Sequence, residues 1–141
     1  MLTTPEQKDA NLLLVVAGAL IDGGGRVLVQ RRPAGTSLAG WWEFPGGMPE
    51  AGETPERGLV RELREELGIR VDPGSLAAAA FASEALGERH LVLLLYICRH
   101  WVGEVAALHA SELRWVDIGA LRDLDMPTAD RPLVTALARL V

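Results

Sequence analysis

The sequence has 141 residues, of which 49% are hydrophobic, and its 14 basic and 19 acidic side chains give a formal net charge of −5. A chain of this length and composition is typical of one globular domain with a sizeable core, which argues against intrinsic disorder. The negative charge disfavours a general affinity for nucleic acid polymers or anionic membrane surfaces. A small anionic substrate stays compatible with this charge if cations intervene.

Nothing in the sequence indicates export or a membrane anchor. The longest apolar run, Leu12 to Ile21, is about half of the roughly 20 residues that a transmembrane helix needs. The first residues lack the pattern of a secretion signal. Cys98 is the only cysteine, which excludes an intrachain disulfide and a cysteine-based zinc cluster. We therefore expect a cytoplasmic protein without a membrane partner, and we leave monomer and homodimer open.

The predicted elements alternate between strands and two helices. We expect residues 1–10 to be a polar N-terminal lead-in and residues 11–141 to form a single domain, because no repeat or linker divides the chain. Apolar runs predict strands at residues 12–21, 26–30, 41–44, 77–83, 90–99 and 113–117, and residues 33–40 and 45–53 are expected to be irregular. A last helix is predicted at residues 131–140. Strands around two helices predict a layered α/β or α+β domain.

The clearest predicted helix begins after Thr54 and ends at Gly68. Thr54 is a favourable N-cap residue, Pro55 suits the first helical position, and glycine is the preferred residue just beyond a helix C-terminus. Three leucines recur at helical spacing and predict a buried stripe, formed by Leu59, Leu63 and Leu67.

Three glutamates, Glu62, Glu65 and Glu66, share an arc of this helix beside the leucine stripe. Glu62 and Glu66 are like charges four residues apart, a pair that costs a few tenths of a kcal/mol. Either neighbouring arginines relieve a solvated acidic face, or the glutamates bind Mg²⁺ or Mn²⁺, which prefer carboxylate oxygens. Gly58 on the same arc costs roughly 1 kcal/mol of helix propensity, and we interpret it as room for a loop or a ligand. Helical spacing alone does not decide between these interpretations.

A longer pattern covers the helix and the loop before it. Residues 47–69 read GMPEAGETPERGLVRELREELGI, which fits G-x5-E-x7-R-E-U-x-E-E-x-G-U, where U is a bulky aliphatic residue. Every fixed position matches, and the probability of a chance match is on the order of 10⁻⁸. The segment resembles the Nudix box of the Nudix hydrolases.

The resemblance implies a fold with a mixed β-sheet between helices, in which the box forms loop, helix and loop. It implies hydrolysis of a nucleoside diphosphate linked to another group. It also implies that Glu62, Glu65 and Glu66 bind Mg²⁺, or Mn²⁺, with the carbonyl of Gly46 as a further ligand. Glu62 is expected to position or deprotonate the attacking water, with Glu66 as the second candidate.

Two further residues of the box have an expected structural role. In the family pattern, Arg61 and Glu53 hold the loop and the helix together by a charge-assisted hydrogen bond and do not touch the substrate.

The stretch QRRPAGTSLAGWWEFPGG resembles the MutT-like branch of the family, nucleoside triphosphate pyrophosphohydrolases that include sanitisers of oxidised dGTP and a CTP-preferring relative. This resemblance implies that Arg32 lies near the phosphates and that Asp130 hydrogen-bonds the nucleobase. A role of Asp130 as N-cap of the last helix is compatible with that contact. Arg89 matches a substrate-contact position, although we prefer the interpretation of an ordinary surface arginine.

One position departs from the branch. A further catalytic glutamate usually lies six residues before the tryptophan that corresponds to Trp115, and this position is His109 here, with Glu112 three residues closer. Either Glu112 substitutes for it, or His109 acts as base or ligand, or the site uses only the helix carboxylates. For Trp41 and Trp42 we favour packing in the core over stacking on a base.

The sequence thus predicts Mg²⁺-dependent hydrolysis of a nucleoside triphosphate to monophosphate and pyrophosphate. An oxidised or modified dNTP is the expected substrate, in nucleotide-pool sanitation and hence DNA repair. One alternative is another Nudix substrate such as ADP-ribose, a dinucleoside polyphosphate or a sugar nucleotide. The other is a non-catalytic nucleotide-binding module, which the intact glutamates oppose.

Overall fold

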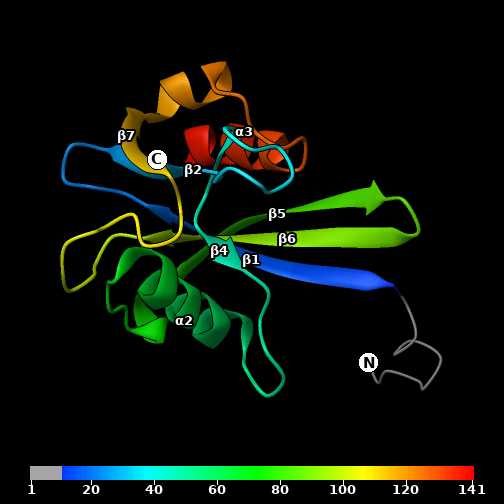
Figure 1. Ribbon diagram of the computed structural model, residues 1–141. Coiled ribbons are helices and arrows are strands. Elements are labelled where there is room, and N and C mark those ends of the chain that lie inside the picture. Colours follow the sequence, from blue (N-terminus) through cyan, green and yellow to red (C-terminus); the bar gives the residue numbers. More distant parts are fainter. Residues whose placement is uncertain (1–10) are drawn as a thin grey trace.

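A computed structural model describes residues 11–141, which form two β-sheets and two α-helices (Figure 1). The expected lead-in at residues 1–10 lies outside the described residues. No helix within residues 11–141 is both long and apolar enough to cross a bilayer. The strands are β1 (Leu12–Leu20), β2 (Arg26–Arg31), β3 (Trp42–Glu43), β4 (Gly46–Gly47), β5 (Ala77–Leu86), β6 (Arg89–Cys98) and β7 (Glu112–Asp117), and the helices are α2 (Pro55–Leu67) and α3 (Asp130–Leu140).

The larger sheet is mixed, with strand order β4-β1-β6-β5. β1 and β6 run parallel, with Leu12 beside His90 and Leu20 beside Cys98, and the other pairs are antiparallel. The smaller sheet has the order β3-β2-β7 and is antiparallel.

The two helices cover opposite faces of the larger sheet, as Figure 1 shows. Side chains of a strand alternate between faces, so Val16 and Leu20 of β1 pack in the cluster with α2, whereas Ala17 and Ala19 pack in the cluster with α3. The predicted leucine stripe of α2 is fully buried: Leu59, Leu63 and Leu67. The predicted mixed sheet between helices is therefore confirmed.

The segment after β3 differs from its prediction. Gly46 and Gly47, expected as a turn, form β4 and pair with Ala17 and Val16 of β1. A Cβ atom on Gly46 would collide with the carbonyl oxygen of Val16. Gly46 is thus needed because the backbones of β4 and β1 approach each other closely, and not because the chain turns there.

Two short 3₁₀ helices, η1 (Pro73–Ser75) and η2 (Ile118–Asp123), were also not predicted. Such elements are too short to show an apolar periodicity, so the sequence does not predict them.

Candidate active site

The capping residues of α2 fix the direction from which its glutamates approach the sheet. The Thr54 hydroxyl accepts a hydrogen bond from the Arg57 amide at 3.2 Å, and Gly68 ends the helix in the left-handed conformation, at φ 74°. Both predicted ends are confirmed, and the helix carries its acidic arc toward β4 and the loop of residues 48–53.

Arg61 joins this loop to the helix. Its Nε donates to Glu53 Oε2 at 2.8 Å, and its Nη2 donates to Glu53 Oε1 at 3.1 Å and to the carbonyl oxygen of Met48 at 3.0 Å. The hydrogen bonds from Arg61 hold the pKa of Glu53 below its usual range. The structure thus brings Arg61 and Glu53 together away from the cavity, as the family pattern implies.

Gly58 provides the space that the loop needs. A Cβ atom there would lie 3.0 Å from the Cα of Pro49 and 3.3 Å from Glu53 Oε1. Of the two interpretations of this glycine, the neighbouring loop is confirmed.

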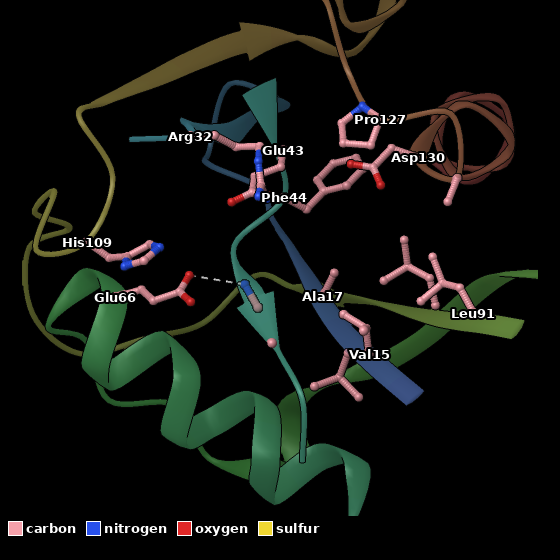
Figure 2. Close-up of a pocket in the computed structure, with 15 residues that line it drawn as sticks. Val15, Ala17, Arg32, Glu43, Phe44, Glu66, Leu91, His109, Pro127 and Asp130 are labelled. Carbon is pink, nitrogen blue, oxygen red and sulfur yellow. Dashed lines mark hydrogen bonds and ion pairs between the residues drawn. The ribbon is translucent and has the colours of Figure 1, made fainter. Parts of the chain in front are cut away.

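Glu66 is the most deeply buried of the three expected metal ligands, with 8% of its surface exposed. Its Oε1 accepts hydrogen bonds from Gln30 Nε2 at 2.8 Å and from the Gly46 amide at 3.2 Å, the latter drawn as the dashed line in Figure 2. Burial, reinforced by the neighbouring Glu62, raises the pKa of Glu66 far above its usual range. A cation bound beside this carboxyl group would offset the cost of ionising it in buried surroundings.

Glu62 lies between Arg61 and the glycine strand. Its Oε1 is 3.0 Å from Arg61 Nη1, and a Cβ atom on Gly47 would come within 2.6 Å of its carboxyl carbon. Glu65 differs, because its side chain is 59% exposed and its carboxylate is 3.2 Å from Arg61 Nη1. Arg61 therefore contacts two of the three expected ligands.

A divalent cation suits the donor chemistry of this region. No three acidic, histidine or cysteine side chains within residues 11–141 are close enough in this conformation to enclose an ion. However, Glu62 and Glu66 are neighbouring carboxylates one helical turn apart on α2, and the buried Glu66 lies beside the backbone of Gly46. Hard oxygen donors of this type are those that Mg²⁺ and Mn²⁺ prefer.

A cavity of about 280 Å³ opens beside Glu66 and extends to α3 (Figure 2). Glu66 and His109 lie at one end, Arg32 and Glu43 at the rim, and Asp130 at the other end. Its lining residues are Val15, Val16, Ala17, Arg32, Glu43, Phe44, Gly46, Gly47, Glu66, Leu91, Leu93, His109, Pro127, Ala129 and Asp130. The cavity thus has an acidic end at Glu66, the positively charged side chain of Arg32 at its rim, and an apolar end that contains the buried carboxyl group of Asp130.

Arg32 is held at the rim by two neighbours. Its Nη1 forms an ion pair of 2.6 Å with Glu43 Oε1, and its Nε donates to the carbonyl oxygen of Ser37 at 2.6 Å. A guanidinium group fixed in this way presents a positive charge to an anionic ligand in the cavity.

Asp130 occupies the apolar end and is 6% exposed. Burial, with the nearby charge of Glu43, raises its pKa to about 7, against the opposing effect of Arg32. The N-cap of α3 is Ala129, without a capping hydrogen bond from a side chain. The alternative role of Asp130 as the N-cap is therefore not observed, and its carboxyl group points into the cavity (Figure 2).

His109, and not Glu112, faces the cavity. Its loop is fixed by hydrogen bonds from the Leu108 amide to the carbonyl oxygen of Glu66 and from the Ser111 amide to that of Arg31, both 3.1 Å. Glu112 instead lies on β7, where its carboxylate is 3.5 Å from each of two exposed arginines.

The remaining candidates lie outside this cavity. Arg89 is exposed at the β5–β6 turn, as an ordinary surface arginine would be. Trp42 packs in the core, as favoured, whereas Trp41 lines a second cavity that shares Arg32 and Pro127 with the first.

Three cavity neighbours were not singled out from the sequence: Gln30, Glu43 and Phe44. Gln30 could have been noticed in the sequence, because it is a polar residue directly after the apolar run of β2. Glu43 and Phe44 could not, since a short segment between two loops has no periodicity.

Comparison with known proteins agrees with this geometry. The model of the NUDIX domain matches residues 12–137. The 8-oxo-dGTP diphosphatase of Escherichia coli is 32% identical over 91% of this chain and 98% of its own length. The CTP pyrophosphohydrolase of the same organism is 33% identical over 92% of this chain and 93% of its own. The solution structure of the Escherichia coli ORF135 protein superimposes with a TM-score of 0.84 at 30% identity, covering 94% of this chain and 93% of that one.

The family match spans both sheets and α2 and reaches into α3, and it includes the glutamates of α2, Arg32 and Asp130. The chain belongs to the NUDIX domain family, with MutT-like relatives.

Proposed function

We propose that this protein is a MutT-like Nudix hydrolase that cleaves a nucleoside triphosphate to the monophosphate and pyrophosphate. An oxidised or otherwise modified deoxynucleoside triphosphate is the proposed substrate. The observation that carries the proposal is the single cavity in which buried Glu66 and buried Asp130 lie at opposite ends, with Arg32 between them at the rim. The names of the relatives, an 8-oxo-dGTP diphosphatase and a CTP pyrophosphohydrolase, support it.

The acidic end is the proposed site of the reaction. Glu62, Glu65, Glu66 and the Gly46 carbonyl are the groups that would hold Mg²⁺, or Mn²⁺. The ion, when bound, neutralises phosphate charge and lowers the pKa of a bound water. Glu62 is the proposed group that orients the attacking water and takes its proton, with Glu66 as the second candidate. Glu62 is the less buried of the two, so its carboxylate is the more accessible to a water molecule.

Arg61 and Glu53 act through structure. Their two hydrogen bonds hold the loop of residues 48–53 against α2 and thereby fix the position of Gly47 and Glu62 relative to each other. A displacement of these groups by 1 Å would be costly for catalysis.

The other end is the proposed base-binding site. Phe44 and Leu91 provide an apolar wall, and Asp130 provides the polar group that reads the base edge. An ionised carboxylate accepts hydrogen bonds from base N–H groups, and a protonated one also donates. Arg32 lies between the two ends, where the phosphates of a nucleotide would pass, whereas exposed Arg89 has no proposed contact with the substrate in this conformation.

We further propose that residues 11–141 form one catalytic domain, and that it acts in the cytoplasm on the nucleotide pool. The single cysteine fits a reducing compartment, in which proteins do not rely on disulfides.

Product analysis across a nucleotide panel tests the proposal. The panel contains the common and oxidised dNTPs, CTP, ADP-ribose and a dinucleoside polyphosphate, with and without Mg²⁺, and Glu62→Gln serves as the inactive control. We expect monophosphate and pyrophosphate from one triphosphate, lost in the variant. Release of orthophosphate would contradict the proposal. Turnover that is unchanged without Mg²⁺ and in Glu62→Gln would contradict it as well. Binding of a nucleotide without metal and without turnover would instead identify a binding module.

A further inference from the structure

Gln30 is a buried polar residue that the mechanism above does not use. It lies on β2, two residues after Leu28 of the core, and only 1% of its surface is exposed. An amide group in such surroundings costs free energy unless its hydrogen bonds are made. Its retention at this position therefore needs an explanation from its contacts.

The amide nitrogen of Gln30 contacts two acidic residues that line the cavity. Nε2 donates to Glu66 Oε1 at 2.8 Å and to Glu43 Oε2 at 3.4 Å. Glu43 is also the direct cross-strand neighbour of Gln30, whereas Glu66 comes from α2. One NH₂ group thus links β2 to Glu66 of α2 and to Glu43, the residue that forms an ion pair with Arg32.

The amide oxygen makes no comparable contact. Oε1 of Gln30 is buried and has no hydrogen-bond partner within residues 11–141. Rotating the amide would not remedy this, because it would place Oε1 against two carboxylates. The orientation shown therefore leaves one acceptor unsatisfied, which is unfavourable, while the NH₂ group points at Glu66 and Glu43.

We propose that Gln30 is a positioning residue, which holds the carboxylates of Glu66 and Glu43 so that the first faces Glu62 and the metal site and the second faces Arg32. A residue needed only for packing would be apolar and would avoid the unsatisfied oxygen. This inference rests on the proposed function, because that function assigns Glu66 to the metal and Arg32 to the phosphates.

Gln30→Met tests the inference, since methionine has a similar length and shape but no hydrogen-bond donor. Mn²⁺ binding to the nucleotide-free protein is measured by calorimetry and by electron paramagnetic resonance, together with kcat, KM and the thermal midpoint. We expect Mn²⁺ affinity and kcat to fall about 10- to 100-fold, as is typical when a partner of a metal ligand is lost. The thermal midpoint checks that the variant remains folded at the assay temperature.

Tyr96→Phe is the matched control. The Tyr96 hydroxyl donates to Glu56 at 2.6 Å and so also joins the sheet to α2, but outside the cavity. This variant loses one hydrogen bond to the helix and should keep wild-type Mn²⁺ affinity. Equal loss of Mn²⁺ affinity in both variants would mean that any weakening of the helix contact suffices, and it would overturn the inference.

Wild-type Mn²⁺ affinity and kcat in Gln30→Met would overturn it as well. If the wild-type protein neither binds Mn²⁺ nor hydrolyses any triphosphate, the proposed function fails separately. Crystal structures of wild type and Gln30→Met then decide about Gln30 alone: a changed Glu66 rotamer in the variant supports the positioning role, and an unchanged one overturns it.

Discussion

The carboxyl group of Glu62 packs directly against the backbone of Gly47, where an added Cβ atom would lie 2.6 Å from the carboxyl carbon. Gly47 has no left-handed φ, so alanine suits its backbone, and only the end of a side chain must move. We expect Gly47→Ala to fold with a loss of about 1 kcal/mol or less and to lose about tenfold in Mn²⁺ affinity. Calorimetry and thermal unfolding check this.

Gly23→Ala is the control for this prediction, because an added Cβ atom there meets nothing within 4 Å. Unchanged Mn²⁺ affinity in Gly47→Ala would show that the present position of Glu62 does not matter for the metal.

Glu62→Gln should lower kcat by about 10²–10⁴-fold, because an amide of the same shape cannot take a proton from water. Steady-state kinetics at saturating Mg²⁺ measures this, with Glu66→Gln alongside and Glu88→Gln as an exposed control. A small effect of Glu62→Gln beside a large effect of Glu66→Gln would assign the base to Glu66.

Arg61→Lys should lower the free energy of unfolding by about 1–3 kcal/mol, because an ammonium group cannot span both Glu53 oxygens and the Met48 carbonyl. The value of kcat/KM should fall with it, since the loop directly follows Gly47 of β4. Denaturant titration beside Arg57→Lys, at an exposed position of the same helix, isolates the effect. Equal stability of the two variants would contradict the bridging role.

Asp130 should make stability depend on pH. Its pKa is about 7 in the folded protein and ordinary, near 3.8, in the unfolded chain. Between these values the folded state binds more protons, so its stability falls as pH rises through this window. The loss at full ionisation is about 4 kcal/mol, because each pKa unit corresponds to about 1.4 kcal/mol.

Asp130→Asn removes this titration. Its stability relative to wild type should therefore increase from pH 4 to pH 8, as measured by denaturant titration at each pH. A difference that is the same at both pH values would mean that the carboxyl group is not held protonated.

His109 should matter for turnover, and Glu112 should not. Of the two residues, only His109 faces the cavity, where it lies beside Glu66. An imidazole in this place can contact the phosphates or a water bound to the metal. We therefore expect His109→Ala to lower kcat/KM about tenfold or more. Glu112→Gln should keep wild-type kinetics, since its carboxylate contacts only exposed arginines. The opposite ranking would show that the loop rearranges to bring Glu112 into the site.

Local signals made much of the fold predictable. Thr54, Pro55 and Gly68 defined α2 correctly because caps act within a few residues, and the leucine stripe was visible at helical spacing. Three strands of the larger sheet, β1, β5 and β6, followed from long apolar runs. By contrast, β4 was missed because two glycines show no side-chain pattern, and their pairing with β1 depends on a distant partner.

The site was predictable where one motif contained it. The motif named Glu53, Arg61, Glu62 and Glu66, which lie together as expected. It gave no access to Gln30 or Glu43, whose contacts with Glu66 and Arg32 arise only when β2, β3 and α2 meet. Whether His109 or Glu112 faces the cavity likewise depended on the path of a loop that has no local pattern.

The parallel pairing of β1 with β6 determines when activity can appear during synthesis. β1 pairs with β6 only after the ribosome has synthesised β6, because Leu12 lies beside His90. β4 is held in place by its pairing with β1. Contacts between such distant positions form slowly, because a long loop must close first. Asp130 arrives later still, in the last helix. A nascent chain that already contains all of α2 therefore has its glutamates but no cavity, and it gains a complete site only after α3 has left the ribosome.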